Sequence, residues 1–127
     1  MEILEQVSKN AFNKQWVADV LKYKQKSEYS IEDCHTVQLL NSFIHKGANG
    51  SHFIMVFEIL GVNLLEIMKR YDYKGIPLPI VRRMAKQVLI GLDYLHRYCK
   101  IIHTDLKPEN VIVSLTKDEL KEIMERG

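Results

Sequence analysis

A stripe of apolar residues between positions 81 and 99 constrains the fold of this 127-residue chain more than any other feature. Its members recur at alternating steps of four and three: Val81, Ala85, Val88, Leu92, Leu95 and Cys99. That spacing places them on one face of an α-helix. The pattern predicts an amphipathic helix over about Leu78–Cys99. By itself such a stripe indicates a core helix and no particular function.

The segment that follows this helix, Ile101–Asn110, reads Ile-Ile-His-Thr-Asp-Leu-Lys-Pro-Glu-Asn. Its His-x-Asp-x4-Asn spacing resembles the catalytic loop of the protein kinase fold. An Asp-x4-Asn pair alone occurs by chance in surface turns, whereas the whole segment behind a long amphipathic helix is far more specific. We therefore interpret it as a phosphoryl-transfer loop.

Three side chains of this loop match what transfer of the ATP γ-phosphoryl group requires near the acceptor. Asp105 is the candidate base that orients the substrate hydroxyl and accepts its proton. Lys107 is the candidate cation that neutralises charge on the phosphoryl oxygens, and Asn110 offers a hard oxygen ligand to Mg²⁺. His103 is expected to have a structural role. ATP and Mg²⁺ are the expected cofactors.

Beyond the loop, the chain resembles the serine/arginine-protein kinases (SRPK family) from about Val37 to Val113. The matching stretches are His45–Gly50, Met55–Gly61, Gly75–Leu78, Gly91–His96 and Ile101–Asp105. Thr104 stands where most protein kinases carry an Arg that binds a phosphorylated activation loop. The resemblance therefore implies a kinase whose activity does not wait for that phosphorylation.

The same resemblance implies the substrate and the setting. It indicates a Ser/Thr protein kinase that acts on Arg/Ser-rich splicing factors and resides in the cytoplasm and the nucleus. Lys107 also favours Ser/Thr over Tyr acceptors. Together with Pro108 and Glu109, it argues against a small-molecule phosphotransferase of the same fold.

The resemblance also implies a nucleotide site. Phe57 would be the gatekeeper behind the adenine pocket, and the backbone of Glu58 and Leu60 would bind adenine at the hinge. Ile112 would lie beneath the adenine ring, a role that is compatible with its being an ordinary core strand residue.

Glu2 is the candidate helix-C glutamate that would pair with an ATP-binding lysine. Glu5 is the alternative, and a solvated helix charge is the other interpretation of both. The 127 residues contain no Gly-rich G-x-G-x-x-G loop, no lysine-bearing strand before Glu2 and no Asp-Phe-Gly after the catalytic loop. Because phosphoryl transfer depends on positioning and electrostatics, we expect the chain alone to have little or no activity. A non-catalytic, kinase-derived interaction module is the alternative.

We expect an α+β fold corresponding to part of a kinase domain. Residues 1–60 would hold a remnant of the N-lobe sheet with helix C and the hinge strand. Residues 61–113 would form the helical start of the C-lobe with the catalytic loop, and residues 114–127 the start of a spacer helix. A polar insert, 8–36, would contain one helix around Trp16. Part of the apolar stripe of the long helix would lack cover, which favours low stability or association.

Local signals predict several elements within this frame. Val37–Phe57 has the pattern of a hairpin, with strands at Val37–Ile44 and His52–Phe57 and a turn at His45–Gly50, in which Asn49-Gly50 is the strongest hairpin signal. Gly61 is expected to break the chain, and Asn63 to cap a following helix. Val111–Val113 reads as a short strand. Thr116 and Glu119 have the spacing of a capping box that opens a last helix.

Composition excludes some classes of partner. The net charge is +2, from 18 basic and 16 acidic side chains, which is too balanced to indicate nucleic acid or an anionic membrane. No apolar run approaches the length of a membrane span. The two cysteines, Cys34 and Cys99, lack metal-ligand spacing, and Cys99 is expected to be a buried thiol.

Overall fold

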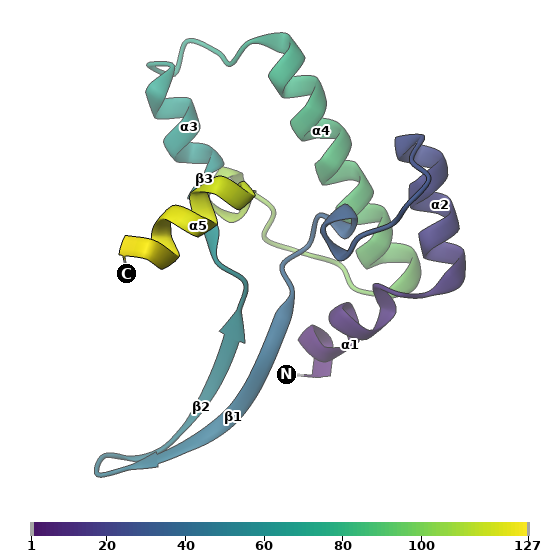
Figure 1. Ribbon diagram of the computed structural model, residues 1–127. Coiled ribbons are helices and arrows are strands. Elements are labelled where there is room, and N and C mark those ends of the chain that lie inside the picture. Colours follow the sequence, from purple (N-terminus) through teal and green to yellow (C-terminus); the bar gives the residue numbers. More distant parts are fainter. Residues whose placement is uncertain (1, 127) are drawn as a thin grey trace. The chain divides into compact units, whose positions relative to one another are not determined.

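The computed structural model describes residues 2–126, without the side chain of Glu2 (Figure 1). The helices are α1 (Glu2–Asn10), α2 (Lys14–Lys24), α3 (Leu64–Arg70), α4 (Leu78–Asp93) and α5 (Lys117–Arg126). The strands are β1 (Leu39–Gly47), β2 (Gly50–Phe57), β3 (Leu60–Asn63) and β4 (Ile112–Ser114). Three short helical segments are η1 (Ile31–Cys34), η2 (Tyr94–Tyr98) and η3 (Pro108–Asn110). The expected α+β class is confirmed.

The chain forms two compact units. Unit 1 comprises Met1–Glu58 and Arg82–His103, and unit 2 comprises Ile59–Val81 and Thr104–Gly127. Each unit contains one antiparallel pair of strands, β1–β2 in unit 1 and β3–β4 in unit 2. The lobe limits at residues 60 and 113 stay a prediction, because compactness alone does not define a kinase lobe.

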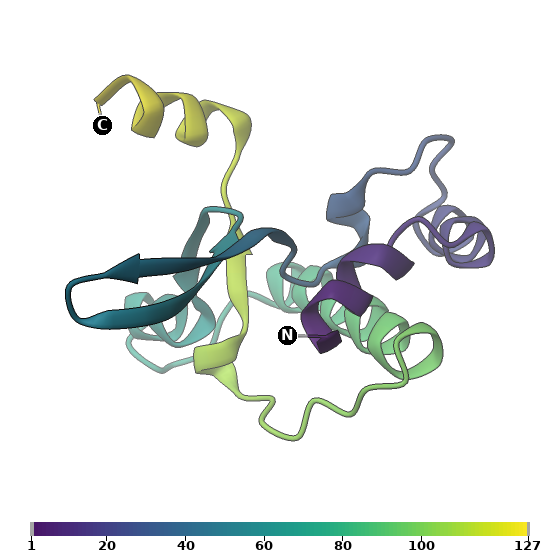
Figure 2. The same ribbon diagram turned by 90° about the horizontal axis from the view of Figure 1, so that it is seen from below.

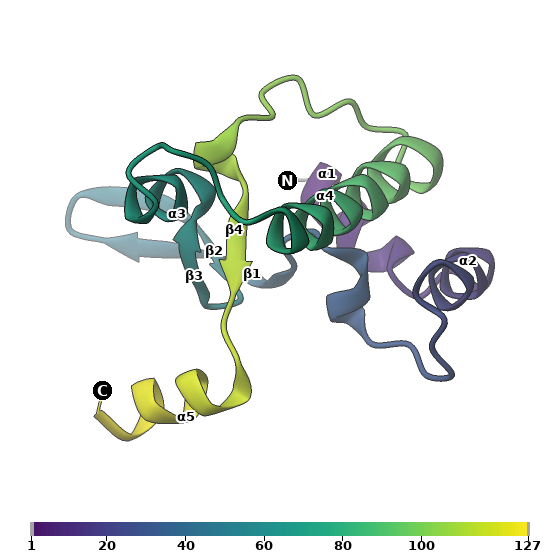
Figure 3. The same ribbon diagram turned by 90° about the horizontal axis from the view of Figure 1, so that it is seen from above.

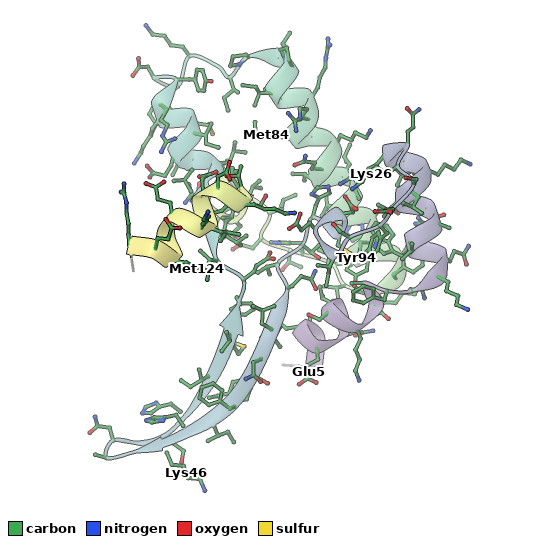
Figure 4. The ribbon with its side chains drawn as sticks, in the orientation of Figure 1. Glu5, Lys26, Lys46, Met84, Tyr94 and Met124 are labelled. Carbon is green, nitrogen blue, oxygen red and sulfur yellow. The ribbon has the colours of Figure 1, made fainter. Side chains whose placement is uncertain are left out.

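The core of unit 1 centres on Trp16, which is fully buried. Its ring centroid lies 4.9 Å from that of Tyr94, and its indole N–H donates to the Cys34 sulfur at 3.1 Å. The buried cluster consists of Val7, Ala11, Trp16, Val20, Cys34, Ile90, Tyr94 and Cys99. Segment 8–36 therefore contains the expected helix and also supplies much of this core. Figure 4 shows Tyr94 among the side chains of the helices of unit 1.

The predicted long helix is confirmed as α4, which continues into the π-helical turn η2. Its buried face differs from the predicted stripe, because Ile90, Gly91 and Tyr94 are buried whereas Val81 and Ala85 are exposed. The core residues of α1, α2 and η1 pack on the later part of the helix only. Gly91 permits this packing, since a Cβ there would lie 2.9 Å from the carbonyl oxygen of His35.

The predicted hairpin is confirmed as β1–β2, with Phe43 opposite Ile54 and His45 opposite His52. Its turn residues, Ala48 and Asn49, lie within the predicted turn His45–Gly50, and the other residues of that segment belong to the two strands. Gly50 begins β2 with φ +108°, a left-handed conformation that favours glycine. The Asn-Gly signal thus located the hairpin correctly, and both strands reach further into the turn segment than predicted.

Unit 2 contains a strand, β3, that the sequence analysis did not predict. Gly61, expected as a break, lies within β3, which pairs with β4 (Figure 3). A Cβ at Gly61 would lie 3.0 Å from the Val113 carbonyl oxygen, so glycine allows the close approach of these strands.

Both predicted helix caps are confirmed in unit 2. The Asn63 side chain accepts a hydrogen bond from the backbone N–H of Glu66 at 3.0 Å at the start of α3. At the start of α5, the Glu119 N–H donates to Thr116 Oγ1 at 3.2 Å, and the Thr116 N–H donates back to the Glu119 carboxylate at 3.2 Å. This reciprocal pair is a capping box.

Candidate functional site

The backbone of the candidate catalytic loop, from Thr104 onward, is held within unit 2. The Asn110 N–H donates to the Lys107 carbonyl at 2.9 Å, which closes the tight turn η3. Pro108 begins this turn, where its missing N–H costs nothing. At the far end, the Leu64 N–H of α3 donates to the Val111 carbonyl at 2.7 Å. The loop is therefore fixed to the start of a helix.

The structure brings the three predicted catalytic side chains together. The Asn110 amide nitrogen donates to the Asp105 carbonyl oxygen at 2.8 Å and to the Asp105 carboxylate at 3.2 Å. Lys107 Nζ lies 3.7 Å from the other carboxylate oxygen of Asp105 and 4.0 Å from the carboxylate of Glu109. All of these side chains are exposed. A carboxylate, a cation and an amide thus converge within six residues.

This arrangement fits the chemistry of phosphoryl transfer. The Asp105 carboxylate is accessible to a substrate hydroxyl and is oriented by Asn110. The two bonds of Asn110 use its amide nitrogen, so they do not engage the amide oxygen that Mg²⁺ would bind. Mg²⁺ commonly takes one or two protein oxygens together with substrate phosphates. The donor set therefore fits that ion.

Thr104 adds a feature that sequence reasoning did not predict. Its φ is +67°, in the left-handed region that β-branched residues rarely adopt. Such conformations cluster at functional sites, where the surrounding structure holds them. Thr104 lies directly before Asp105, so its backbone conformation sets the direction of the chain at this candidate base. No local sequence signal reveals this conformation.

Two of the predicted adenine-site residues lie in neighbouring strands. Leu60 is in β3 opposite Ser114, and Ile112 is in β4 opposite Asn63. The Ile112 side chain is 47% exposed, so it is available for contact with a ligand as well as for packing. The structure thus brings Leu60 and Ile112 into one small sheet. Its geometry agrees with the predicted roles without testing them.

The gatekeeper candidate Phe57 and the hinge candidate Glu58 belong to unit 1. Phe57 is the last residue of β2, and both Phe57 and Glu58 are half-buried. Burial, followed by the negative charge of Glu32, raises the pKa of the Glu58 carboxyl, although a backbone hydrogen bond from Gln38 opposes the shift. The assignment of Phe57 and Glu58 to an adenine pocket stays a prediction.

The helix-C candidates are not distinguished by the structure. Glu2 begins α1, and its side chain lies outside the described residues. Glu5 is exposed on the same helix, as Figure 4 shows. The candidate pairing of either glutamate with a lysine stays a prediction.

Two kinds of feature are absent from residues 2–126. No group of three or more His, Cys, Asp or Glu side chains in this range could hold a metal ion. No helix in it has both the length and the apolar character of a membrane span.

Comparisons with known proteins bear on the family of the chain. Residues 7–123 match the family described as the protein kinase domain. The chain is 66% identical over 77 residues to the serine/threonine-protein kinase SRPK of Physarum polycephalum, a match that covers 61% of this chain and 18% of that protein. It is 49% identical over 102 residues to protein kinase dsk1 of Schizosaccharomyces pombe, covering 80% and 19% of the two chains.

A third relative is the serine/threonine-protein kinase SKY1 of Saccharomyces cerevisiae, 57% identical over 81 residues, covering 64% of this chain and 11% of that protein. The resemblance to SRPK kinases noted in the sequence is therefore confirmed. The chain spans less than a fifth of the length of these three relatives.

Proposed function

This chain belongs to the protein kinase family, and on that premise we propose that it is the central part of a Ser/Thr kinase of the SRPK type. In this role Asp105 is the catalytic base, Lys107 the cation beside the transferred phosphoryl group and Asn110 the Mg²⁺ ligand. The supporting observation is the convergence of these side chains, with Asn110 and Lys107 both within 3.7 Å of the Asp105 carboxylate.

The contribution of these residues to the reaction follows from their chemistry. Asp105 orients the attacking hydroxyl and takes up its proton. Lys107 carries positive charge on a side chain that is about half exposed, so it is free to turn toward phosphoryl oxygens. When bound, Mg²⁺ supplies further positive charge at the phosphates. ATP is the proposed phosphoryl donor, with Phe57, Glu58, Leu60 and Ile112 at the adenine and Glu2 on helix C.

The proposed acceptor is Ser within Arg/Ser-rich splicing factors, in the cytoplasm and the nucleus. The names of the relatives support a protein substrate, since SRSF protein kinase 3 of Mus musculus is 52% identical to this chain over 77 residues. No direct binding of nucleic acid or membrane is proposed. Imaging of the tagged protein tests the localisation: residence in only one of the two compartments would contradict it.

The isolated 127-residue chain is expected to be inactive or very weak. Among its residues there is no Gly-rich phosphate loop and no Asp-Phe-Gly. Loss of such positioning and charge costs orders of magnitude in rate. Robust Mg²⁺-dependent phosphorylation of an Arg-Ser peptide by the purified chain would overturn this expectation.

The decisive test of the kinase function uses the longest reading frame that includes these residues. Its purified product is incubated with labelled ATP, Mg²⁺ and an Arg-Ser repeat peptide, with a Lys-Ser repeat as the matched control. We expect phosphorylation of Ser in the Arg-Ser peptide, lowered at least ~100-fold by Asp105→Asn. Failure of that product to transfer phosphate, together with stable binding of the peptide, would favour the alternative of a non-catalytic interaction module.

A further inference from the structure

The C-terminal end of α1 is tied to segments that lie far along the chain. The Tyr94 hydroxyl donates to the Val7 carbonyl, and the Tyr29 hydroxyl donates to the Ala11 carbonyl, directly after the helix, at 2.5 Å. The last carbonyl groups of a helix have no partner within that helix. Figure 2 shows α1, in purple, beside the end of α4, in green. Residues outside α1 therefore complete its end.

The turn η2 is held from two sides. The Asn10 side-chain amide, at the end of α1, donates to the Tyr98 carbonyl at 3.3 Å. From α2, the Asp19 carboxylate accepts hydrogen bonds from the Tyr98 hydroxyl at 2.7 Å and from Arg97 Nη2 at 3.0 Å. Arg97 Nη2 also donates to the Tyr23 hydroxyl at 3.0 Å. Hydrogen bonds to a charged group are stronger than neutral ones, so Asp19 joins α2 firmly to η2.

A buried core connects these two attachments. The Trp16 ring of α2 lies 5.5 Å from the Tyr98 ring, and the Trp16 indole N–H donates to Cys34 Sγ at 3.1 Å. The same sulfur lies 2.8 Å from the Tyr29 hydroxyl, which binds the end of α1. Trp16 and Cys34 are fully buried. Residues 11–34 therefore form one packed segment that contacts both α1 and η2.

Neither the sequence resemblance nor the catalytic loop accounts for this arrangement. The resemblance to the SRPK kinases begins near Val37, and the candidate catalytic side chains lie after His103. The helix α1, however, includes Glu2 and Glu5, the candidates for the helix-C glutamate. In protein kinases this glutamate must pair with the ATP-binding lysine, and the position of helix C controls that pair. A segment that fixes α1 would therefore affect phosphoryl transfer without contacting a substrate.

We propose that residues 11–34 are a clamp that fixes α1 to η2, and that Tyr29 and Asp19 are positioning residues for the helix-C glutamate. This inference rests on the proposed kinase function. Tyr29 acts on the end of α1 directly, whereas Asp19 acts through Tyr98, whose carbonyl binds Asn10. Because the bonds of the clamp are internal, they need no phosphate group. The clamp thus supports helix C in a chain without the phosphate-binding Arg of the catalytic loop.

Hydrogen–deuterium exchange of the 127-residue chain tests whether the clamp holds α1. Tyr29→Phe removes only the hydroxyl, so we expect the amides of residues 6–10 to exchange about 10-fold faster. The amides of residues 82–90 in α4 should keep the parental rate, because the opening is local. Tyr73→Phe, at an exposed position, is the matched control. Parental exchange in α1, or an equal increase in α1 and α4, would overturn the proposal.

Asp19 provides a second variant, because its carboxylate is partly exposed and its removal leaves the buried core in place. Asp19→Ala should speed exchange in α1 at least ~3-fold. Asp19→Glu should restore the parental rate, since it keeps the negative charge. Circular dichroism verifies that each variant is folded. Parental exchange in a folded Asp19→Ala variant would overturn the role of Asp19 in the clamp.

The product of the longest reading frame tests the catalytic consequence. Tyr29→Phe and Asp19→Ala should lower kcat for the Arg-Ser peptide at least ~10-fold and leave its KM within about twofold. Tyr73→Phe should keep both constants. A parent product that transfers no phosphate would refute the proposed function itself. An active parent whose two variants keep its kcat would refute the clamp alone, even if exchange in α1 were faster.

Discussion

The Asn110 amide nitrogen lies 3.2 Å from the Asp105 carboxylate and 2.8 Å from the carbonyl oxygen of the same residue. Because both groups are exposed, Asn110→Ala should lower the free energy of unfolding by less than about 1 kcal/mol. In the proposed longer kinase it should lower kcat at least ~10-fold, since it would disorient the proposed base and remove the proposed metal ligand. Urea unfolding and peptide phosphorylation measure the two effects. A loss of stability above ~2 kcal/mol would instead indicate a structural role.

Trp16 is the largest fully buried side chain of the described core. Its replacement by alanine should destabilise the chain by about 3–5 kcal/mol, because it leaves a cavity against Tyr94. Trp16→Phe retains much of the contact and should cost less. Lys22→Ala, at an exposed position of the same helix, is the control with little expected effect. Denaturant titration followed by far-UV circular dichroism measures all three, and a near-neutral Trp16→Ala would contradict this core.

Gly91→Ala tests the close packing of α4. In an exposed helix such a change stabilises by up to ~1 kcal/mol, because alanine is the better helix former. Here the new methyl group would lie 2.9 Å from the His35 carbonyl oxygen and 3.4 Å from that of Cys34. We therefore expect a lower Tm and a loss of ~1–3 kcal/mol. The exposed helix position Lys86→Ala is the control, and a rise in Tm for Gly91→Ala would contradict the packing.

The hydrogen-bonded carboxylate of Asp33 leads us to expect a loss of stability at low pH. Burial acts to raise its pKa, but hydrogen bonds from Lys24, Ser30 N–H and Lys26 outweigh burial and hold the pKa at about 2. The folded-state pKa lies below the unfolded value of ~3.9. This carboxylate therefore stabilises the fold above pH ~4, and the contribution is lost as the pH falls toward 2.

Replacement by Asp33→Asn should remove that pH dependence. Tm measured between pH 2 and 5 compares the variant with the parent chain. Asp118→Asn, on the exposed first turn of α5, should keep the parent profile. Identical slopes for Asp33→Asn and the parent would show that the ion pairs with Lys24 and Lys26 do not stabilise the fold.

The buried side chain of His35 leads us to expect a change in stability at milder pH. Burial, followed by the positive charge of Lys24, lowers its pKa to about 4. Its buried Nε2 has no hydrogen-bond partner in the described part of the chain. In the unfolded chain the pKa of this histidine is ~6.5, so the unfolded state binds a proton more readily than the folded state. The free energy of unfolding should therefore fall as the pH drops from ~6.5 to 4. His35→Asn should flatten this part of the profile while tolerating φ +54°. An unchanged profile in that window would rule out His35 as its source.

Local sequence signals correctly predicted several elements. The helical stripe identified α4, the side chains of Asn63 and Thr116 marked two helix starts, and the Asn-Gly pair indicated the hairpin. These signals work because caps, turns and amphipathic faces depend on residues within a few positions of one another. The catalytic loop belongs to the same class, since Asp105, Lys107 and Asn110 meet within one turn.

Other features depend on contacts between distant segments. Gly61 reads as a break in the sequence and is a strand residue in the fold, because Val113 approaches it closely. The buried face of α4 is centred on Ile90 and Tyr94, because Trp16 and Cys34 pack there. The periodicity of α4 alone cannot reveal that Trp16 and Cys34 pack against it.

The sequence by itself therefore determined the kinase resemblance and the candidate site, because the candidate catalytic residues are close neighbours along the chain. Only the tertiary structure decided that segment 8–36 is part of a core, that Thr104 has a left-handed backbone and that Gly61 lies in a paired strand. Those properties depend on which surfaces meet in space. Burial and strand pairing depend on contacts between distant segments, which the local sequence does not specify.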